Sequence, residues 1–232
     1  MNNQAQIKRT CFLAATLAVL VLQPLANRAS TTILNFDSVN ASAGQVDATS
    51  YFASYGVTET SLVGGSAFSI VNQNDFYGTP GIVYASSSPN FVDPLSSQGA
   101  ATAILLSFAT PLTSLSFTRI EETGIGAGNS FGAWSAEVYS GATEIGSASE
   151  SGYSIFNNSI NPAQTYTFTG SDITSIEFDG NSYGFYGTQG ILMDDFTMTT
   201  AVPESTTMIA GFLLLLPLAA SSFRVCRRLI RA

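Results

Sequence analysis

The chain has 232 residues but no histidine and only two cysteines, and charged residues make up just 10% of it. Without histidine, Ser-His-Asp and Cys-His catalysis are excluded, and two cysteines argue against zinc sites and a disulfide scaffold. Between residues 30 and 200 the only base is Arg119, against 15 of the 16 acids, a net charge of about −14. A body this acidic has no basic patch for phosphates, so nucleic acid is not an expected partner.

The first residues have the pattern of a secretory signal peptide. Lys8 and Arg9 precede an uncharged run from Cys11 to Leu22. Twelve helical residues span roughly 18 Å, which is too short to cross a hydrocarbon core of about 30 Å. We therefore expect an export signal over residues 1–29, cleaved between Ala26 and Ser30. The alternatives are an uncleaved anchor and a buried helix.

A second apolar run, near the C-terminus, is long enough to span a membrane. From Ser205 to Phe223 there are 19 residues without a charge, which is about 28 Å at the helical rise. Four arginines follow without an acid, and the positive-inside rule then keeps this end in the cytoplasm and the body outside. We expect a single transmembrane helix over about residues 206–223, and the alternative is a buried soluble helix. The basic tail, residues 224–232, carries Arg224, Arg227, Arg228 and Arg231.

The final segment, residues 201–232, resembles a known sorting signal. Val202-Pro203-Glu204-Ser205, an apolar helix and an Arg-rich end look like the tripartite PEP-CTERM signal, with Ser205 in place of the second proline of its Pro-Glu-Pro motif. The resemblance covers Val202 to Ala232 and rests on the motif residues Val202, Pro203 and Glu204. It implies processing by an exosortase, a membrane transpeptidase-like enzyme, in a bacterium with an outer membrane. The chain would be membrane-anchored before processing and at the cell surface or outside the cell afterwards; the alternative is a permanent anchor.

The body, residues 30–200, is predicted to be one all-β domain. It is rich in Gly, Ser, Thr and aromatic residues, and short β-branched and aromatic runs recur between turn clusters. About eleven short strands with Gly- and Pro-marked turns favour a β-sandwich of the jelly-roll type. The predicted strands are 32–36, 56–62, 67–71, 81–85, 103–108, 112–120, 132–139, 143–148, 165–169, 173–179 and 190–199.

Alternation within two of these strands predicts which side chains share one face. A strand that is buried on one side places every second residue toward the core. The residues assigned to one face are Trp134, Ala136 and Val138 in one strand, and Leu192, Asp194, Phe196 and Met198 in the last strand.

One internal echo points to a sugar-binding surface. The segment from Phe76 to Val83 is matched 109 residues later by the segment from Phe185 to Leu192, each with an aromatic pair, a Gly-marked turn and an apolar strand. Either the same turn chemistry arose twice, or both loops lie at one rim and present Tyr77 and Tyr186 together. In the second case these rings, with Trp134, would stack on the apolar faces of sugar rings.

The two ends of the body also look like the ectodomains often attached to PEP-CTERM tails. Such domains open on a Leu-Asn-Phe-Asp strand, here Leu34 to Asp37, and close on Asp-Asp-Phe or Asp-Asn-Phe, here Asp194 to Phe196. In sandwiches of this sort the first and last strands often lie close and can share a calcium ion. The resemblance thus implies calcium at Asp37, Asp194 and Asp195, whose carboxylates are hard oxygen ligands. The alternative is that Asp194 accepts hydrogen bonds from backbone N–H groups at a strand end.

Catalysis by two carboxylates, as in glycosidases, is the chemistry that the composition leaves open. Glu121 and Glu122 are adjacent, and neighbouring strand residues point to opposite faces, so they form a poor catalytic pair. We therefore expect a non-enzymatic envelope or extracellular-matrix component, sorted through its tail and associated with surface polysaccharide. The alternative is a carbohydrate-binding module on the cell surface, and the third hypothesis is a carboxylate-dependent glycosidase. No cofactor other than calcium is expected.

Overall fold

The computed structural model describes residues 29–42, 44–63, 65–74, 83–87, 89–95, 101–123, 129–155, 159–180 and 191–200. Every strand pairing among them is antiparallel. The elements are β1 (Thr31–Leu34), β2 (Val46–Asp47), α2 (Thr49–Ser54), β3 (Val57–Ser61), β4 (Ala67–Asn72), β5 (Val83–Tyr84), β6 (Asn90–Leu95), β7 (Thr102–Arg119), β8 (Glu121–Thr123), β9 (Asn129–Phe131), β10 (Trp134–Ser140), β11 (Thr143–Glu150), β12 (Tyr153–Ile155), β13 (Ile160–Asn161), β14 (Gln164–Gly180) and β15 (Met193–Thr200).

The predicted all-β character is confirmed for the described residues, but two pairs of predicted strands are continuous. Strands 103–108 and 112–120 merge into β7, and strands 165–169 and 173–179 merge into β14. These two long strands pair along their length, with register shifts between Thr169 and Ser175 of β14. Irregularities of this kind bend a strand without ending it. The turn-like Thr110-Pro111 of β7 therefore marks a bend rather than a break.

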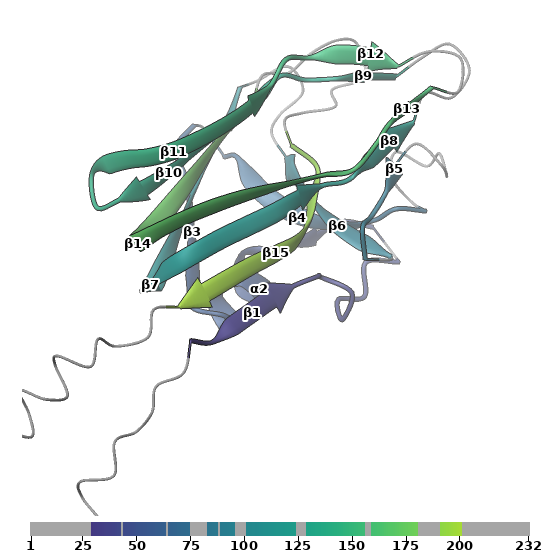
Figure 1. Ribbon diagram of the computed structural model, residues 1–232. Coiled ribbons are helices and arrows are strands. Elements are labelled where there is room, and N and C mark those ends of the chain that lie inside the picture. The colour runs from purple at the N-terminus through teal and green to yellow at the C-terminus, as the bar shows by residue number, and fades with distance from the viewer. Residues whose placement is uncertain are drawn as a thin grey trace, which may run out of the picture. The chain divides into compact units, whose positions relative to one another are not determined.

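The main sheet folds over on itself and encloses a large hydrophobic cluster. The first half of β7 pairs with β3, and its second half pairs with β15. Both halves nevertheless send side chains into the same cluster, which includes Leu106 and Phe117. The bends in β7 and β14 let the two halves lie in facing layers, with this cluster between them. Figure 1 shows this arrangement, with β1, β15 and part of β7 in front of β3, β4 and β6, and the β-sandwich is thus observed directly.

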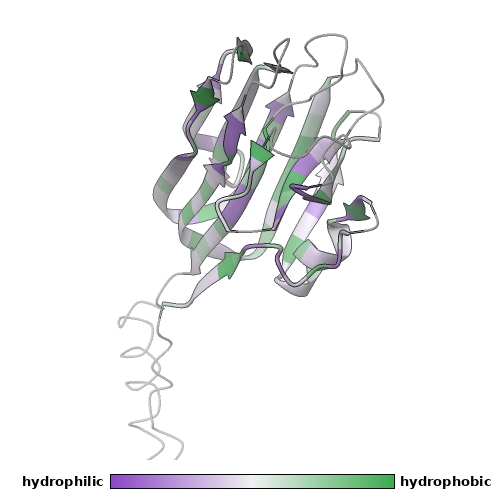
Figure 2. Cartoon of the chain, turned by 90° about the vertical axis from the view of Figure 1, so that its right-hand side faces the viewer, coloured by the Kyte–Doolittle hydropathy of each residue, from purple (hydrophilic) through white to green (hydrophobic). Residues whose placement is uncertain are grey.

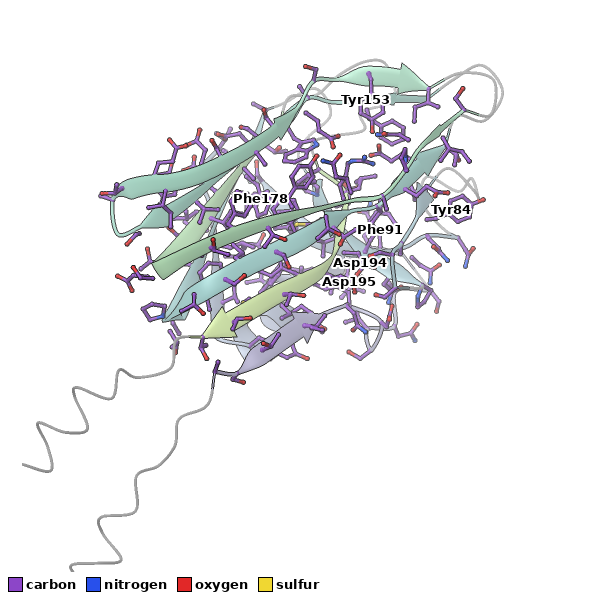
Figure 3. The ribbon with its side chains drawn as sticks, in the orientation of Figure 1. Tyr84, Phe91, Tyr153, Phe178, Asp194 and Asp195 are labelled. Carbon is purple, nitrogen blue, oxygen red and sulfur yellow. The ribbon has the colours of Figure 1, made fainter. Side chains whose placement is uncertain are left out.

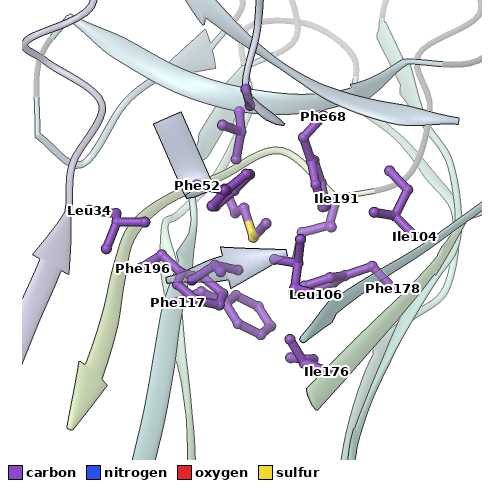
Figure 4. Packing of buried hydrophobic residues seen from close by; sticks show 14 of the residues in the cluster. Leu34, Phe52, Phe68, Ile104, Leu106, Phe117, Ile176, Phe178, Ile191 and Phe196 are labelled. Carbon is purple, nitrogen blue, oxygen red and sulfur yellow. The ribbon is translucent and has the colours of Figure 1, made fainter. Parts of the chain in front are cut away.

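Aromatic rings fill much of the large cluster. Phe117 lies against Trp134, Tyr166 and Phe178, with ring centroids 6.1, 5.5 and 5.3 Å away. Figure 4 shows Phe117 and Phe178 packed with Leu106 and Ile176. Burying one such side chain contributes about 1.5–3 kcal/mol, so this cluster supplies most of the folding free energy. Figure 2 shows the corresponding alternation of hydrophobic and hydrophilic bands along the strands.

A short helix that the sequence analysis did not predict closes one side of the large cluster. Asp47 accepts a hydrogen bond from the Thr49 backbone N–H at 2.8 Å near the start of α2, and Gly56, with φ +73, follows its end. The helix buries Phe52, whose ring meets Phe68 and Phe196 edge-on. Its six residues form two turns at most, so the tertiary contact of Phe52 stabilises the helix more than its propensity does.

The predicted alternation is confirmed in β10 and is only partly right in β15. Trp134, Ala136 and Val138 are all buried in the large cluster. In β15 the register shifts between Asp194 and Thr197, and Asp195 has φ +49. This bulge breaks the period of two, so Leu192 enters a different cluster from Phe196. The assignment of Leu192 and Phe196 to one face is therefore wrong.

That second cluster, here called the small cluster, lies under two small sheets. It consists of Val71, Val83, Phe91, Ile120, Phe131, Ile155 and Leu192. One of the small sheets is β9 with β12, and the other has the strand order β13-β8-β5. Figure 1 shows both at the opposite end of the molecule from β1.

The first and last strands are neighbours. β1 pairs with β15 from Thr31 opposite Thr199 to Leu34 opposite Phe196. The Thr200 backbone N–H donates to the Ser30 carbonyl at 3.0 Å. The body therefore begins and ends at one place, and the small cluster lies at the other end (Figure 1).

Candidate functional site

Several predicted site residues lie outside the described residues. No described helix has the length and apolar character needed to span a membrane, and the helix predicted over 206–223 is not among the described segments. The residues in question are Tyr77, Tyr186, Val202, Pro203, Glu204, Arg224, Arg227, Arg228 and Arg231.

Trp134, the third residue of the predicted sugar-stacking set, is buried. Its side chain is 4% exposed. The ring meets Phe117 and Tyr166 edge-on, at 6.1 and 5.1 Å between centroids. Its position on the inward face of β10 covers it with the opposite layer, so Trp134 presents no free ring face to a sugar. Its indole Nε1 is one of the buried polar atoms without a hydrogen-bond partner.

The acidic end of β15 is held by hydrogen-bond donors. Asp194 is fully buried, and its Oδ2 accepts from the Ser87 backbone N–H at 2.7 Å and from the Ser87 hydroxyl at 3.0 Å. Its Oδ1 accepts from the Asp195 backbone N–H at 2.7 Å. The Ser86 hydroxyl lies 2.7 Å from Asp195 Oδ2 and 3.1 Å from Asp194 Oδ2. Burial raises the pKa of Asp194 to about 6, and the donors of Ser87 and Asp195 limit that rise.

The three predicted calcium ligands do not form one group of carboxylates. Among the described residues, which include Asp37, Asp194 and Asp195, no three carboxylates form a group that would hold a metal ion. Asp37 Oδ1 is buried without a hydrogen-bond partner. The Asp194 carboxylate is instead surrounded by donors, which satisfy a carboxylate without a metal. The alternative interpretation, a carboxylate bonded to backbone N–H groups at a strand end, is confirmed for Asp194.

Arg119, the only base of the body, is buried at the end of β7 with 2% exposure. Its Nε donates to Glu150 Oε1 at 3.0 Å, and its Nη1 lies 3.3 Å from Glu122 Oε2. The same guanidinium also donates to the backbone carbonyls of Ile120, at 2.8 Å, and Pro162, at 2.7 Å. Arg119 thus joins the ends of β7, β8 and β11 to the segment before β14.

Further side chains complete this network. Tyr166 donates to Glu150, and Asn161 Nδ2 donates to Glu122 Oε2 at 3.2 Å and to the Tyr153 hydroxyl. Burial raises the pKa of Glu122 to about 8, although Arg119 and Asn161 favour its ionised form. The hydrogen bonds and ion pairs of this network all join protein groups, and Glu122 is only 2% exposed. The network therefore cross-links neighbouring strands.

Glu121 and Glu122 face opposite sides of β8, as predicted. Glu122 is buried and bonded to Arg119, whereas Glu121 is partly exposed and lies opposite Tyr84 of β5. The two carboxylates therefore cannot converge on one substrate.

Among the described residues, Asp93 has a buried carboxyl group without a hydrogen-bond partner on either oxygen. It belongs to β6 and is 1% exposed. Burial raises its pKa to about 7. An ionised carboxylate in such surroundings is costly, so the folded chain favours the protonated acid.

The two echoed segments end in the same place. Val83 and Leu192 are the last residues of the two matched segments, and both lie in the small cluster. The loops before them fall outside the described residues, which begin again at Val83 and Ile191. The ends of the two segments therefore meet in one cluster, and the shared rim of the loops themselves stays a prediction.

An exposed aromatic face lies outside the small cluster. On the sheet β13-β8-β5, Tyr84 is 47% exposed and Ile160 is 60% exposed. Tyr84 lies opposite Glu121, and Ile160 lies opposite Thr123, which shares a face with Glu121 because the two are two residues apart. Figure 3 shows Tyr84 at the periphery of the molecule. We call Tyr84 and Ile160, together with the partly exposed Glu121, the Tyr84 face.

Sequence reasoning missed both the Tyr84 face and the Arg119 network. β8 and β13 are three and two residues long, too short for periodicity to reveal them. The one available signal was the isolation of Arg119 among 15 acids, since a lone base in an acidic body is a natural partner for buried carboxylates.

Comparisons with known proteins yield structural likenesses only. No protein-family profile matches the chain. No curated protein matches it either.

Among solved structures, the K2 cleaved adhesin domain of Lys-gingipain is 14% identical, with a TM-score of 0.46, over 74% of this chain and 100% of that one. The carbohydrate-binding module TmCBM61, solved with beta-1,4-galactotriose, is 11% identical, with a TM-score of 0.35, over 65% and 94%. The family 11 module from Clostridium thermocellum, solved with a beta-1,3-1,4-mixed-linked tetrasaccharide, is 12% identical, with a TM-score of 0.30, over 77% and 100%. At TM-scores below 0.5 these likenesses do not define the ligand of this chain.

Proposed function

We propose that this chain is an exported, surface-directed protein without enzymatic activity, whose jelly-roll-like β-sandwich binds polysaccharide. We propose further that its C-terminal segment is a PEP-CTERM-type signal, processed by an exosortase-type enzyme after membrane anchoring. The body would then reside at the cell surface or outside the cell.

The pairing of β1 with β15 is the observation that carries this proposal. It brings Ser30, just after the predicted export signal, next to Thr200. Only Ala201 and Val202 separate Thr200 from the Pro203-Glu204 motif. The first and last residues of the body therefore lie side by side, which supports a domain flanked by an export signal and a sorting signal. The small cluster and the Tyr84 face lie at the opposite end of the body (Figure 1).

The chemistry of the body supports a binding role over catalysis. Residues 30–200 hold no histidine, cysteine or lysine, and their one arginine is engaged in the buried network. An exposed aromatic ring beside a carboxylate, as at Tyr84 and Glu121, offers an apolar platform and a hydroxyl acceptor, the two features that a sugar requires.

The sorting part is tested by the intact mass of the protein extracted from the cell surface. We expect loss of everything after about Pro203 to Ser205, and Glu204→Ala should block that loss. Ser205→Ala is the matched control, because position 205 already departs from the motif, and it should leave processing unchanged. A mature mass that still contains the Arg-rich tail in the unmodified chain contradicts processing and leaves a permanent anchor.

The binding part is tested by a glycan-array screen of the full-length chain in detergent, with and without calcium. We expect retention of at least one neutral polysaccharide, unchanged by a calcium chelator, since the three predicted carboxylate ligands do not form one group. An array on which no glycan is retained at high protein concentration overturns the binding role but leaves the sorting proposal standing.

A further inference from the structure

We infer that the Tyr84 face is the docking subsite for a neutral hexose unit of a polysaccharide chain. The inference rests on the proposed polysaccharide-binding function and names the residues that perform it. Trp134, which the sequence analysis predicted to stack on a sugar, is buried, and the exposed ring of Tyr84 takes that role in this inference.

The geometry places the three side chains on one surface. β5 pairs with β8 so that Tyr84 lies opposite Glu121, and β8 pairs with β13 so that Ile160 lies opposite Thr123. Residues two apart on a strand share a face, and directly opposite residues have Cβ atoms about 4.5–5.5 Å apart. The three side chains therefore span a width comparable to one or two sugar rings.

The chemistry of the face fits a hexose. The flat phenol ring and the Ile160 side chain match the apolar C–H face of a pyranose, and 47% and 60% of these side chains are exposed in the unbound chain. Glu121 is partly exposed and carries a carboxylate that accepts hydrogen bonds from sugar hydroxyls. Apolar contact and hydroxyl acceptor thus lie side by side on adjacent strands.

The charge of the body selects a neutral polymer. Its only base, Arg119, is 2% exposed and bonded to two carboxylates. No described cation is therefore available to a uronate, sulfate or phosphate, and the acidic residues, Glu121 among them, repel one. A neutral glycan meets no such repulsion.

The inner sides of the same strands hold the face rigidly. Val83, next to Tyr84, is 1% exposed in the small cluster. Glu122, next to Glu121, is bonded to Arg119, and Asn161, next to Ile160, is bonded to Glu122. Each exposed residue thus has a neighbour fixed on the buried side, so binding requires little ordering of the backbone.

The test is affinity electrophoresis of the full-length chain in detergent through gels that contain neutral glucan, galactan or mannan, with polygalacturonate as the anionic arm. We expect retardation by a neutral polymer, weakened roughly tenfold or more by Tyr84→Ala, as for the loss of one central aromatic anchor. Tyr84→Phe keeps the ring and should stay within about twofold of the unmodified chain. Tyr55→Ala is the matched control, because Tyr55 is 42% exposed but follows α2, and it should change nothing.

Ile160→Asp is the second variant, and it adds a charge to the face without removing the ring. It should also weaken retardation, which protects the test against a folding defect specific to Tyr84→Ala. If the unmodified chain is retarded and both variants migrate like it, the inference is wrong while the binding function stands. If no neutral polymer retards the unmodified chain, the binding function itself fails. If polygalacturonate, which is anionic, retards the chain more than the neutral polymers do, the inference is wrong, because it requires the acidic body to repel anionic glycans.

Discussion

The large and the small cluster divide the molecule into two regions of different character. Among the described residues, the large cluster has 24 buried members, drawn mostly from the folded main sheet, whereas the small cluster has seven, drawn from short strands and strand ends. Of the three described acids that are buried and whose pKa burial raises, Asp93 and Glu122 lie on strands that contribute to or cover the small cluster, and Asp194 lies at the start of β15, two residues after Leu192 of that cluster. The comparison indicates that most of the stability resides in the first region, and we propose that the second region is the one that binds.

Truncating a ring in each cluster gives the largest expected contrast. Phe117→Ala leaves a cavity among four aromatic rings, and we expect it to lower the free energy of unfolding by about 3–5 kcal/mol, measured by urea denaturation. Phe131→Ala removes the ring that meets Tyr153 at 5.6 Å in the small cluster. There we expect faster amide exchange confined to β9 and β12. If both variants lowered the global free energy of unfolding by the same amount, the two clusters would not differ in their contribution to stability.

Removing Arg119, which cross-links the strands, should also lower the free energy of unfolding, but by less than Phe117→Ala does. Arg119→Met leaves Glu122 and Glu150 without their base and two backbone carbonyls without a donor, and breaking such a buried pair costs about 3 kcal/mol. Arg119→Lys keeps the positive charge but lacks the several N–H donors of the guanidinium. Its denaturation midpoint should therefore fall between those of the unmodified chain and Arg119→Met. If the denaturation midpoint of Arg119→Met equals that of the unmodified chain, Arg119 does not stabilise the fold by cross-linking its strands.

The unpartnered acid predicts a pH dependence. Burial raises the pKa of Asp93 from 3.8 to about 7, so the folded state favours the protonated form. Its contribution to stability is complete below pH 3.8 and is lost as the pH rises through about 7. Stability should therefore fall between these values, and the raised pKa of Glu122 extends the fall toward about 8.

Asp93→Asn isolates that contribution, because the amide is nearly the same size and carries no charge. The slope of urea midpoint against pH should become shallower in this variant, and the variant should exceed the unmodified chain in stability at pH 8. Identical slopes for the two chains would show that Asp93 has a partner in solution and is ionised without cost.

The smallest expected effect lies outside both clusters. Gly141, in the turn between β10 and β11, has φ +59 and open space around it. Gly141→Ala meets no clash but forces a side chain into the left-handed region, and we expect a loss of about 1 kcal/mol without a change in exchange at the small cluster. A loss as large as that of Phe117→Ala would mean that the hairpin, rather than the core, governs stability.

Sequence reasoning served the large cluster well. The alternation of Trp134, Ala136 and Val138 identified inward positions because β10 is long and buried on one face. The strand at 67–71 was likewise found at Ala67–Asn72. Where a strand bends, periodicity fails. It predicts separate strands at 103–108 and 112–120 where β7 is continuous, and the left-handed Asp195 places Leu192 in the other cluster.

The small-cluster region was harder to predict because its elements are short and their partners distant. β6 was missed since Asp93 and Pro94 both argue against a strand, yet it pairs with β4 along all six residues. The Arg119 network joins residues 119, 122, 150 and 161, and no local pattern encodes that meeting. The sugar-stacking set had the same weakness, because propensity does not tell a buried tryptophan from an exposed one.

Labelling of intact cells tests the central claim that the small-cluster end is displayed outside. Ile160→Cys, in a chain that also carries Cys11→Ser and Cys226→Ser, places one thiol on the Tyr84 face, and the same chain without Ile160→Cys is the control. A membrane-impermeant maleimide should label the thiol in whole cells, and the control should stay unlabelled. Labelling that appears only after the cells are lysed would contradict the claim.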